Sequence, residues 1–265
     1  MSTKIRIDKL HEDLCTKCLG RTILFSHEVD STNNWAKELA MQKALEGTVV
    51  VAKTQTSGRG RLGRRWLSPA GGLWFSLILK PELRPAEAVK LTFVTGLAVA
   101  KVLCEMFGLE AETKWPNDVL VNGRKISGIL TEMNTTGETV KFVVVGVGVN
   151  ANFDVKKKFP ESLRKVATSL ENELGRKVLL EDLLRALLEA LEIIYELFIR
   201  EGFNSILEEW KSYAGFLGRQ VEVISPTEKL SGLALDVDNE GALVLRLKDG
   251  TIKHVFVGDL LMRID

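Results

Sequence analysis

A segment rich in glycine and arginine, Gln55–Trp66 (QTSGRGRLGRRW), is the part of the chain whose residue types and spacing point most directly to chemistry. Its glycines follow the dinucleotide-binding pattern G-x-G-x-x-G, and arginines are interleaved with them: Gly58, Gly60 and Gly63, with Arg59, Arg61, Arg64 and Arg65. Guanidinium groups keep their charge and bind phosphate oxygens in pairs, and glycine lets the backbone fold closely around a ligand. The segment therefore predicts a loop that closes over a polyanion, with a solvated basic loop as the alternative.

Known phosphate-binding motifs do not account for this loop. A dinucleotide-binding fold needs the glycines to open a helix, but here they are followed by Trp66, Pro69 and two more glycines and then by a strand-like run. No Gly-Lys-Ser/Thr ends the run as in a P-loop, and the sequence contains no His-Arg-Asp loop of the protein-kinase type. We therefore expect the loop to join two strands.

Three further stretches combine polar residues in unusual ways. The stretch Lys114–Asp118 (KWPND) places a cation, an amide and a carboxylate around a proline at the end of a predicted strand. Lys125 lies just inside the next predicted strand, and a very apolar strand ends in small residues and Asn150. Each stretch alone is typical of a turn or a strand cap. Their joint occurrence predicts a binding site.

The segments around these residues alternate between strand and helix patterns. Ser31 or Thr32 is expected to cap a helix after the first strand. Strands are expected at 22–29, 48–55, 71–80, 112–121, 125–133 and 140–150, and longer helices at 86–107 and 184–198. This grouping favours an α+β (α/β) fold, with a mixed β-sheet backed by helices, over a regular Rossmann alternation.

The last part of the chain has a different pattern. Short strand-like segments follow one another without helical periodicity, separated by tight turns at Asn239–Gly241 and Asp249–Gly250. We expect residues 217–265 to form a small β-barrel-like domain.

Composition restricts the class of protein. The 265 residues are 45% hydrophobic and carry a net charge of +1, so no global field attracts nucleic acid or membranes. The first twenty residues lack an apolar signal segment, and charges interrupt the segment 86–107, so no membrane contact is expected. Three cysteines favour a cytoplasmic location. Cys15 and Cys18 are interpreted as ordinary thiols rather than as half a metal site or a redox pair.

Taken in order, the stretches STNNWA, KTQTSGRGRLGRRWLSPAGGLWFSL, KWPNDVLVNGRKISGIL and GVGVNAN resemble the biotin protein ligases (biotin–[acetyl-CoA-carboxylase] ligases). The resemblance covers about Thr22–Asp265. It implies a catalytic domain over 22–216 with a class II synthetase-like mixed sheet, and an SH3-like domain over 217–265. Residues 1–21 would be an N-terminal extension, too short for the winged helix of ligase-repressors. No nucleic-acid binding is therefore expected.

The resemblance also implies roles for individual residues. A polar cluster would surround the ureido ring of biotin, Trp74 would line the apolar end of the pocket, and Lys125 would meet the biotin carboxylate. The biotin-binding set is Ser31, Thr32, Asn33, Gln55, Arg59, Gly60, Arg61, Trp74, Lys125 and Gly128. The ATP-binding set is Arg59, Arg61, Arg64, Trp66, Lys114, Asn117, Asp118 and Asn150, with Asn150 at the adenine edge. Lys125, Arg59 and Arg61 would be catalytic.

The chemistry of the implied reaction agrees with these residue types. The ureido group needs hydrogen-bond partners, and the carboxylate must approach the α-phosphate of ATP although both are anions. Fixed cations of the protein would offset that repulsion, together with Mg²⁺ that is bound mainly through the ATP phosphates. No protein metal site is expected. The products would be biotinyl-5′-AMP and pyrophosphate, and the biotinyl group would pass to a lysine of a biotin carboxyl carrier protein. Asp118 or a phosphate oxygen would take the lysine proton.

A homodimer is also expected.

Two alternative functions remain. Lipoate or octanoyl transfer on a related fold is disfavoured because the glycine–arginine loop and KWPND match the biotin branch. A nucleic-acid-binding module would need a basic C-terminal domain, whereas residues 217–265 hold more acidic than basic side chains.

Overall fold

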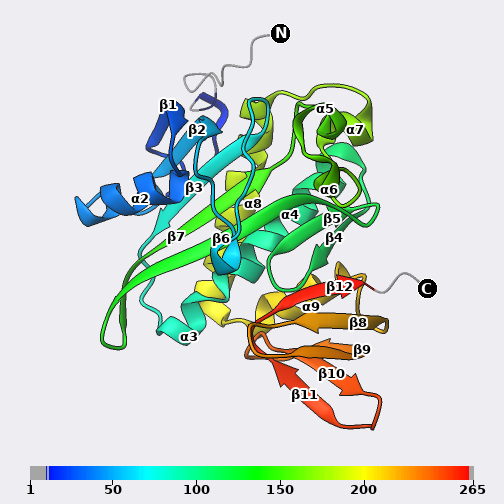
Figure 1. Ribbon diagram of the computed structural model, residues 1–265. Helices are drawn as coiled ribbons and strands as arrows, with labels where there is room; N and C mark the ends of the chain where they lie inside the picture. The colour runs from blue at the N-terminus through cyan, green and yellow to red at the C-terminus, as the bar shows by residue number, and fades with distance from the viewer. Residues whose placement is uncertain (1–9, 11, 263–265) are drawn as a thin grey trace.

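The computed structural model describes residue 10 and residues 12–262, and the larger of its two sheets has seven strands (Figure 1). Only β1 and β2 pair in parallel, and the other neighbours are antiparallel. In spatial order the strands are β1 (Ile23–Val29), β2 (Val49–Gln55), β3 (Leu73–Leu79), β7 (Thr139–Val149), β6 (Arg124–Thr136), β5 (Asp118–Val121) and β4 (Ala111–Lys114). The prediction of a mixed sheet in an α+β fold is confirmed.

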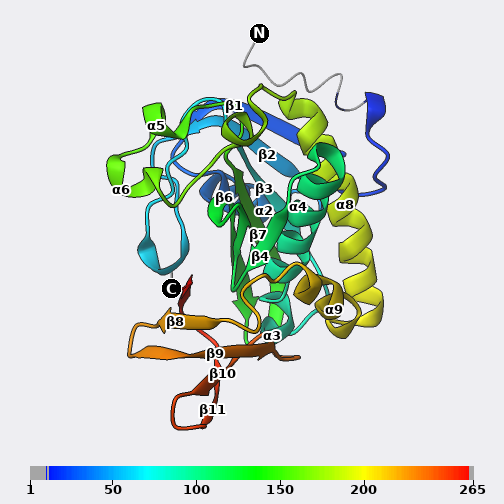
Figure 2. The same ribbon diagram turned by 90° about the vertical axis from the view of Figure 1, so that its right-hand side faces the viewer.

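Both faces of this sheet are covered. Successive side chains of a strand point to opposite faces, so Val49 and Val51 join the main core while Val50 packs toward the other side with α2 (Thr32–Met41). Figure 2 shows α4 (Leu91–Phe107) and α8 (Leu180–Glu201) side by side along the main-core face. Since both faces are buried, β2 and β3 are apolar runs with little alternation.

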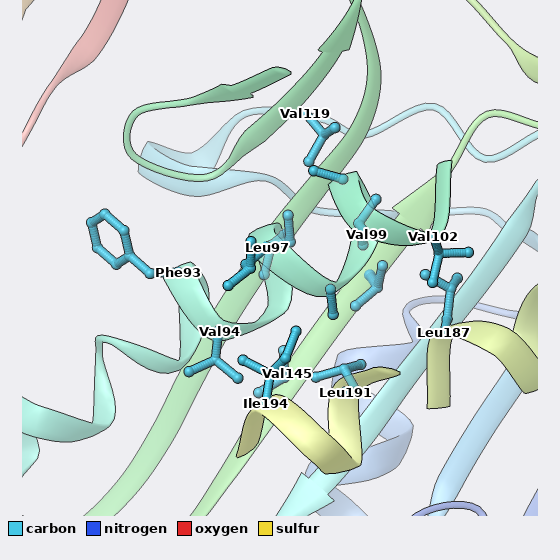
Figure 3. Close-up of a cluster of buried hydrophobic side chains, with 14 of the residues drawn as sticks. Phe93, Val94, Leu97, Val99, Val102, Val119, Val145, Leu187, Leu191 and Ile194 are labelled. Carbon is cyan, nitrogen blue, oxygen red and sulfur yellow. The ribbon is translucent and has the colours of Figure 1, made fainter. Parts of the chain in front are cut away.

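The main core is formed by apolar side chains of α4, α8 and the larger sheet, which pack against one another. Leu187, Leu191 and Ile194 of α8 lie against the valines and leucines of α4 (Figure 3). Their spacing of three and four residues is the pattern that predicted a helix at 184–198, and α8 confirms it.

Two predicted elements are divided in the structure. The expected helix at 86–107 consists of α3 (Pro85–Ala88) and α4, with a turn at Lys90, whose buried ammonium pairs with Glu87 at 2.9 Å. The expected strand at 112–121 is a hairpin of β4 and β5, because the chain reverses in a turn at 115–117. The hairpin turn places Asn117 and Asp118 together.

Several elements have no counterpart in the prediction. They are α5 (Val155–Lys158), α6 (Glu161–Arg164), α7 (Leu170–Leu174), α9 (Asn204–Ser212), the 3₁₀ turn η1 (Arg61–Gly63) and the strand β12 (Asp259–Met262). None of the helices in the described part of the chain is long and apolar enough to cross a membrane.

The C-terminal strands form a second, antiparallel sheet with its own order. The strands are β11 (Ile252–Val255), β10 (Leu243–Leu247), β9 (Lys229–Val237), β8 (Gln220–Ile224) and β12. Side chains of this sheet, among them Val221, Val223 and Leu260, join the same continuous core as α4 and α8. The smaller sheet therefore shares its core with the rest of the protein.

Candidate active site

A cavity of about 250 Å³ opens where α2, the glycine–arginine loop, the β4–β5 turn, β6 and β7 meet. Fourteen of the residues predicted for the site line it: Ser31, Thr32, Asn33, Gln55, Arg59, Gly60, Arg61, Arg64, Trp66, Asn117, Asp118, Lys125, Gly128 and Asn150. The fold thus gathers segments that lie more than a hundred residues apart in the sequence.

One end of the cavity is formed by a chain of hydrogen bonds at the start of α2. The side-chain oxygen of Gln55 accepts from the backbone N–H of Thr32 at 2.8 Å and from its hydroxyl at 3.1 Å. Ser76 Oγ lies 2.8 Å from the Thr32 hydroxyl and 2.7 Å from Asn33 Oδ1. Ser31 is the helix N-cap residue by backbone geometry, but its side chain makes no capping bond. These donors and acceptors suit a small polar ring.

Trp66 forms another part of the cavity wall. Gly128 and Gly148 are cross-strand partners on β6 and β7, and a Cβ on either would meet the Trp66 indole at 2.9 and 2.6 Å. The glycine pair therefore makes a slot for the indole. Within the described residues, the Trp66 Nε1 donor is buried without a hydrogen-bond partner.

Asn150 directly follows β7, which carries Gly148 of this slot. Its amide nitrogen donates to Thr168 O at 2.9 Å, which directs its oxygen the other way. Asn150 Oδ1 is buried and has no partner among the described residues, although a buried acceptor is normally paired. The arrangement leaves an acceptor available for an N–H of a ligand.

The Asp118 carboxylate, which lines the cavity, lies between two lysine ammonium groups. Lys125 Nζ lies 2.6 Å from Asp118 Oδ1 and 5.0 Å from the centre of the Trp66 ring. The Lys114 ammonium is 3.8 Å from the other oxygen of Asp118. Burial lowers the pKa of Lys114, and the Asp118 carboxylate opposes that effect. The β4–β5 hairpin turn is what places these groups together.

The glycine–arginine loop joins β2 and β3, as predicted, and its backbone is folded into a hairpin. Gly60 N donates to Arg64 O at 2.7 Å, and Leu62 and Gly63 adopt positive φ at its tip. Arg61 donates to Asn117 Oδ1 at 3.3 Å and to the carbonyl of Gly258 at 3.2 Å. Burial lowers the pKa of Arg61, while nearby acidic side chains oppose the shift.

The C-terminal sheet also reaches the cavity. Arg64 forms an ion pair with Asp259 at 2.5 Å, and Asp259 itself lines the cavity. The loop is therefore held from two sides, by the β4–β5 turn and by the segment that leads into β12.

Comparisons with known proteins agree with this geometry. Residues 25–150 match the Biotin/lipoate A/B protein ligase family, and residues 216–263 match the Biotin protein ligase C terminal domain. The bifunctional ligase/repressor BirA of Bacillus subtilis (strain 168) is 36% identical over 258 residues, which cover 97% of this chain and 79% of that protein. The chain belongs to the biotin protein ligase family.

Two other members of the biotin protein ligase family are similar over most of their length. The biotin–[acetyl-CoA-carboxylase] ligase of Paracoccus denitrificans is 36% identical, with 82% of this chain and 91% of that protein covered. The biotin protein ligase of Aquifex aeolicus, solved in complex with biotin and ATP, is 31% identical, with a TM-score of 0.78 and coverage of 92% and 100%.

Two residues of the predicted site set, Trp74 and Lys114, lie outside the lining of the cavity. Trp74 does not line the cavity; it is completely buried behind it, with its ring edge-on to Trp66 at 6.2 Å and its Nε1 bonded to Pro69 O. Its place on the fully buried strand β3 explains this. Lys114 also lies outside the lining and reaches the site only through Asp118.

The apolar wall of the cavity was missed by the sequence analysis. Phe159, Leu163 and Ala167 lie four residues apart, from the end of α5 to just past α6, and all three line the cavity together with Val166. That four-residue spacing was the available signal. The helices are short and Pro160 separates them, so the pattern does not extend far enough to stand out. Other lining residues not predicted are Arg65, Leu67, Ile129, Leu130, Gly146, Val147, Gly148 and Asp259.

Proposed function

We propose that this protein performs ATP-dependent biotin ligation in two steps, forming biotinyl-5′-AMP and pyrophosphate from biotin and MgATP and then transferring the biotinyl group to a lysine of a biotin carboxyl carrier protein. The observation that carries the proposal is the continuity of the cavity. One cavity is lined by the polar residues at the start of α2, by the side chains of Arg61, Arg64 and Lys125, and by Trp66 and Asn150. Two substrates that must react head to head can therefore occupy it together.

In the first step the biotin carboxylate attacks the α-phosphorus, the bond from that phosphorus to the bridging oxygen breaks, and pyrophosphate leaves. The polar chain around Thr32 and Gln55 would bind the ureido ring, and the apolar wall would bind the rest of the molecule. Lys125 would offset the carboxylate charge, and Arg61 and Arg64 the charge on the phosphates. Asn150 Oδ1 would accept a hydrogen bond from the adenine amine.

In the second step the lysine amine of the acceptor attacks the acyl carbon and AMP leaves. The amine must lose a proton, and the Asp118 carboxylate lies at the cavity between two ammonium groups. We propose that Asp118 or a phosphate oxygen accepts it. The Paracoccus relative is named for acetyl-CoA carboxylase, which is consistent with a carboxyl carrier domain as acceptor.

Mg²⁺ would enter with the nucleotide. Among the described residues no group of three or more His, Cys, Asp or Glu side chains is placed to hold a metal ion. The cavity instead presents guanidinium and ammonium groups, which suit phosphate oxygens. When bound, Mg²⁺ would neutralise charge on the leaving pyrophosphate.

The test is ATP–pyrophosphate exchange by the purified protein with biotin or lipoate as the acid. Lipoate is the relevant rival, because the family matched by residues 25–150 includes lipoate ligases. Exchange that requires biotin and is absent with lipoate supports the proposal. Exchange that requires lipoate, or none with either acid, contradicts it.

Three expectations from the sequence stay predictions: a cytoplasmic location, a homodimer and the lack of duplex DNA binding. Each is open to a direct measurement, such as sedimentation at tens of micromolar for the homodimer.

A further inference from the structure

Glu132, on β6, is a charged residue at the cavity margin to which the sequence analysis gave no role. It follows the lining residues Ile129 and Leu130 on the same strand, and its side chain is 21% exposed. Three side chains from two other segments converge on its carboxylate. Lys37 and Asn33 come from α2, and Arg59 comes from the glycine–arginine loop.

The contacts of Glu132 divide between its two oxygens. Oε1 accepts from the Lys37 ammonium at 2.5 Å. Oε2 accepts from Asn33 Nδ2 at 2.7 Å and from Arg59 Nη2 at 3.0 Å. One oxygen atom of Glu132 therefore contacts both Asn33, at the start of α2, and Arg59, in the glycine–arginine loop.

On the α2 side, an ionised Glu132 determines the orientation of the Asn33 side-chain amide. A carboxylate can only accept, so the amide nitrogen of Asn33 must face it and the amide oxygen must face Ser76. The second N–H of that amide donates to Leu130 O at 3.2 Å. Gly146 provides the room, because a Cβ there would lie 2.0 Å from Asn33 Oδ1. Glu132 and Ser76 thus decide which way the Asn33 amide faces.

On the loop side, Glu132 holds an arginine that lines the cavity. Arg59 lies where the loop hairpin closes, in an isolated bridge with Arg65. Its guanidinium also donates to Asn34 Oδ1 at 2.7 Å, so α2 and β6 hold it together. The Arg59 side chain is 41% exposed, and without the carboxylate its remaining bond within the described residues would be the one to Asn34.

We propose that Glu132 is a positioning residue that couples recognition of the biotin ring to closure of the glycine–arginine loop, by holding Asn33 and Arg59 through one carboxylate oxygen. The proposal rests on the assignment of the cavity to biotin and ATP. Ring binding restrains Asn33, Asn33 restrains Glu132, and Glu132 keeps Arg59 and the loop over the ligand.

The surroundings of Glu132 keep it ionised. Burial alone would raise its pKa, but hydrogen bonds from Lys37 and Asn33 and the charges of Lys37 and Arg59 outweigh that effect and hold the pKa below its ordinary value. The carboxylate is therefore charged throughout the neutral range, as the Arg59 contact requires.

Glu132→Gln tests the coupling because it keeps the shape of the side chain and removes its charge. In the ligand-free protein, trypsin should cut within Arg59–Arg65 about tenfold faster than in the unaltered protein, as measured by mass spectrometry of the fragments. Biotin should also dissociate about tenfold faster, since a charge-assisted hydrogen bond to a partly exposed group is lost. Lys37→Gln is the matched control; it removes a cation from the same carboxylate without touching the loop, and both rates should stay within about twofold of the unaltered protein.

A double-variant cycle separates coupling from two independent effects. Arg59→Gln should speed biotin dissociation about tenfold in the unaltered protein but less than about twofold in the Glu132→Gln background. Unchanged trypsin cutting in Glu132→Gln, or an Arg59→Gln effect of equal size in both backgrounds, would overturn the proposal. Biotin-dependent exchange by the unaltered protein is measured in parallel. If it is present while the coupling is absent, only this inference fails; if it is absent, the function proposed above fails.

Discussion

Lys125 lines the cavity, and in the proposed reaction its ammonium would lie where the biotin carboxylate meets the α-phosphate of ATP. Its ammonium is held by the Asp118 carboxylate at 2.6 Å and by the face of Trp66, so it is fixed in place in the absence of substrate. A cation that needs no rearrangement stabilises developing charge more effectively than a mobile one. The sequence singled out this lysine by its position just inside a predicted strand, and the family resemblance supplied its expected role at the biotin carboxylate.

Lys125→Ala should weaken biotin binding and slow adenylate formation together. We expect a loss of about 3 kcal/mol in kcat/KM for biotin, the order found when one preorganised donor is removed from a reacting centre. ATP–pyrophosphate exchange measures it, with Lys141→Ala on an exposed position of β7 as control. Unchanged exchange in Lys125→Ala would exclude the role.

Gly148→Ala tests the slot for the Trp66 indole. The new methyl group would lie 2.6 Å from Trp66 Nε1, so the ring must shift. We expect the KM for ATP to rise about tenfold, because stacking of a base on an aromatic side chain is worth about 1–3 kcal/mol. Gly96→Ala is the control, since its nearest new contact is an ordinary 3.5 Å. An unaltered KM for ATP would show that Trp66 does not support the nucleotide.

At the scale of elements, the glycine–arginine loop was predicted from composition and exclusion, and the structure confirms that it joins two strands. Its contacts were not predictable. Gly258 and Asp259 come from a segment almost two hundred residues later, and no local pattern reports such a pairing. The KWPND hairpin was missed for a different reason, because its two strands of four residues read as one extended run.

Arg61→Gly should separate synthesis of the adenylate from its retention. The substitution removes the bonds to Asn117 and Gly258 that hold the loop, while the loop keeps its glycines and can still fold. We expect biotinyl-AMP to form but to dissociate faster, so that lysines of bystander proteins become labelled. Rapid filtration and streptavidin blotting of serum albumin measure this.

Leu62→Ala, at an exposed position of the same loop, is the control for Arg61→Gly and should retain the adenylate. An Arg61→Gly protein that holds its adenylate as long as the unaltered protein would assign the loop to substrate binding alone.

At the scale of the whole molecule, one continuous core includes buried side chains from both sheets. The segment before β1 also belongs to this core through Leu10, Leu14 and Leu19. Glu192 of α8 fixes that segment, because its carboxylate accepts backbone N–H bonds from Lys17, Cys18 and Leu19. Periodicity marked α8 as amphipathic but could not show what its buried glutamate binds.

Glu192→Gln tests this attachment through its pH dependence. Burial raises the pKa of Glu192, but the three backbone donors outweigh it and hold the pKa below the ordinary value. The ionised carboxylate therefore stabilises the fold fully above the unfolded-state pKa, and this contribution is lost as pH falls through the lower, folded-state pKa. At pH 7 the Tm of Glu192→Gln should be about 5 °C lower, the shift expected for about 2 kcal/mol. The difference should disappear in acid.

Thermal unfolding of Glu192→Gln is measured between pH 3 and 7, an approximate range around the ordinary glutamate pKa. The comparison is Glu196→Gln, whose carboxylate contacts the exposed Lys17 ammonium at 3.5 Å. Equal Tm values for the two variants at pH 7 would contradict a specific attachment by Glu192.

The central claim is that one cavity makes biotinyl-AMP, retains it and delivers it to a carrier lysine. The most direct measurement uses biotin and ATP labelled at the α-phosphate, followed by rapid gel filtration of the protein and addition of a biotin carboxyl carrier domain. We predict about one label per protein after filtration, released as AMP on addition of the carrier, with biotin then found on the carrier lysine. Lys125→Ala should retain much less label after the same incubation, because it forms the adenylate more slowly. Label that never accompanies the unaltered protein, or that is retained equally without biotin, would contradict the account.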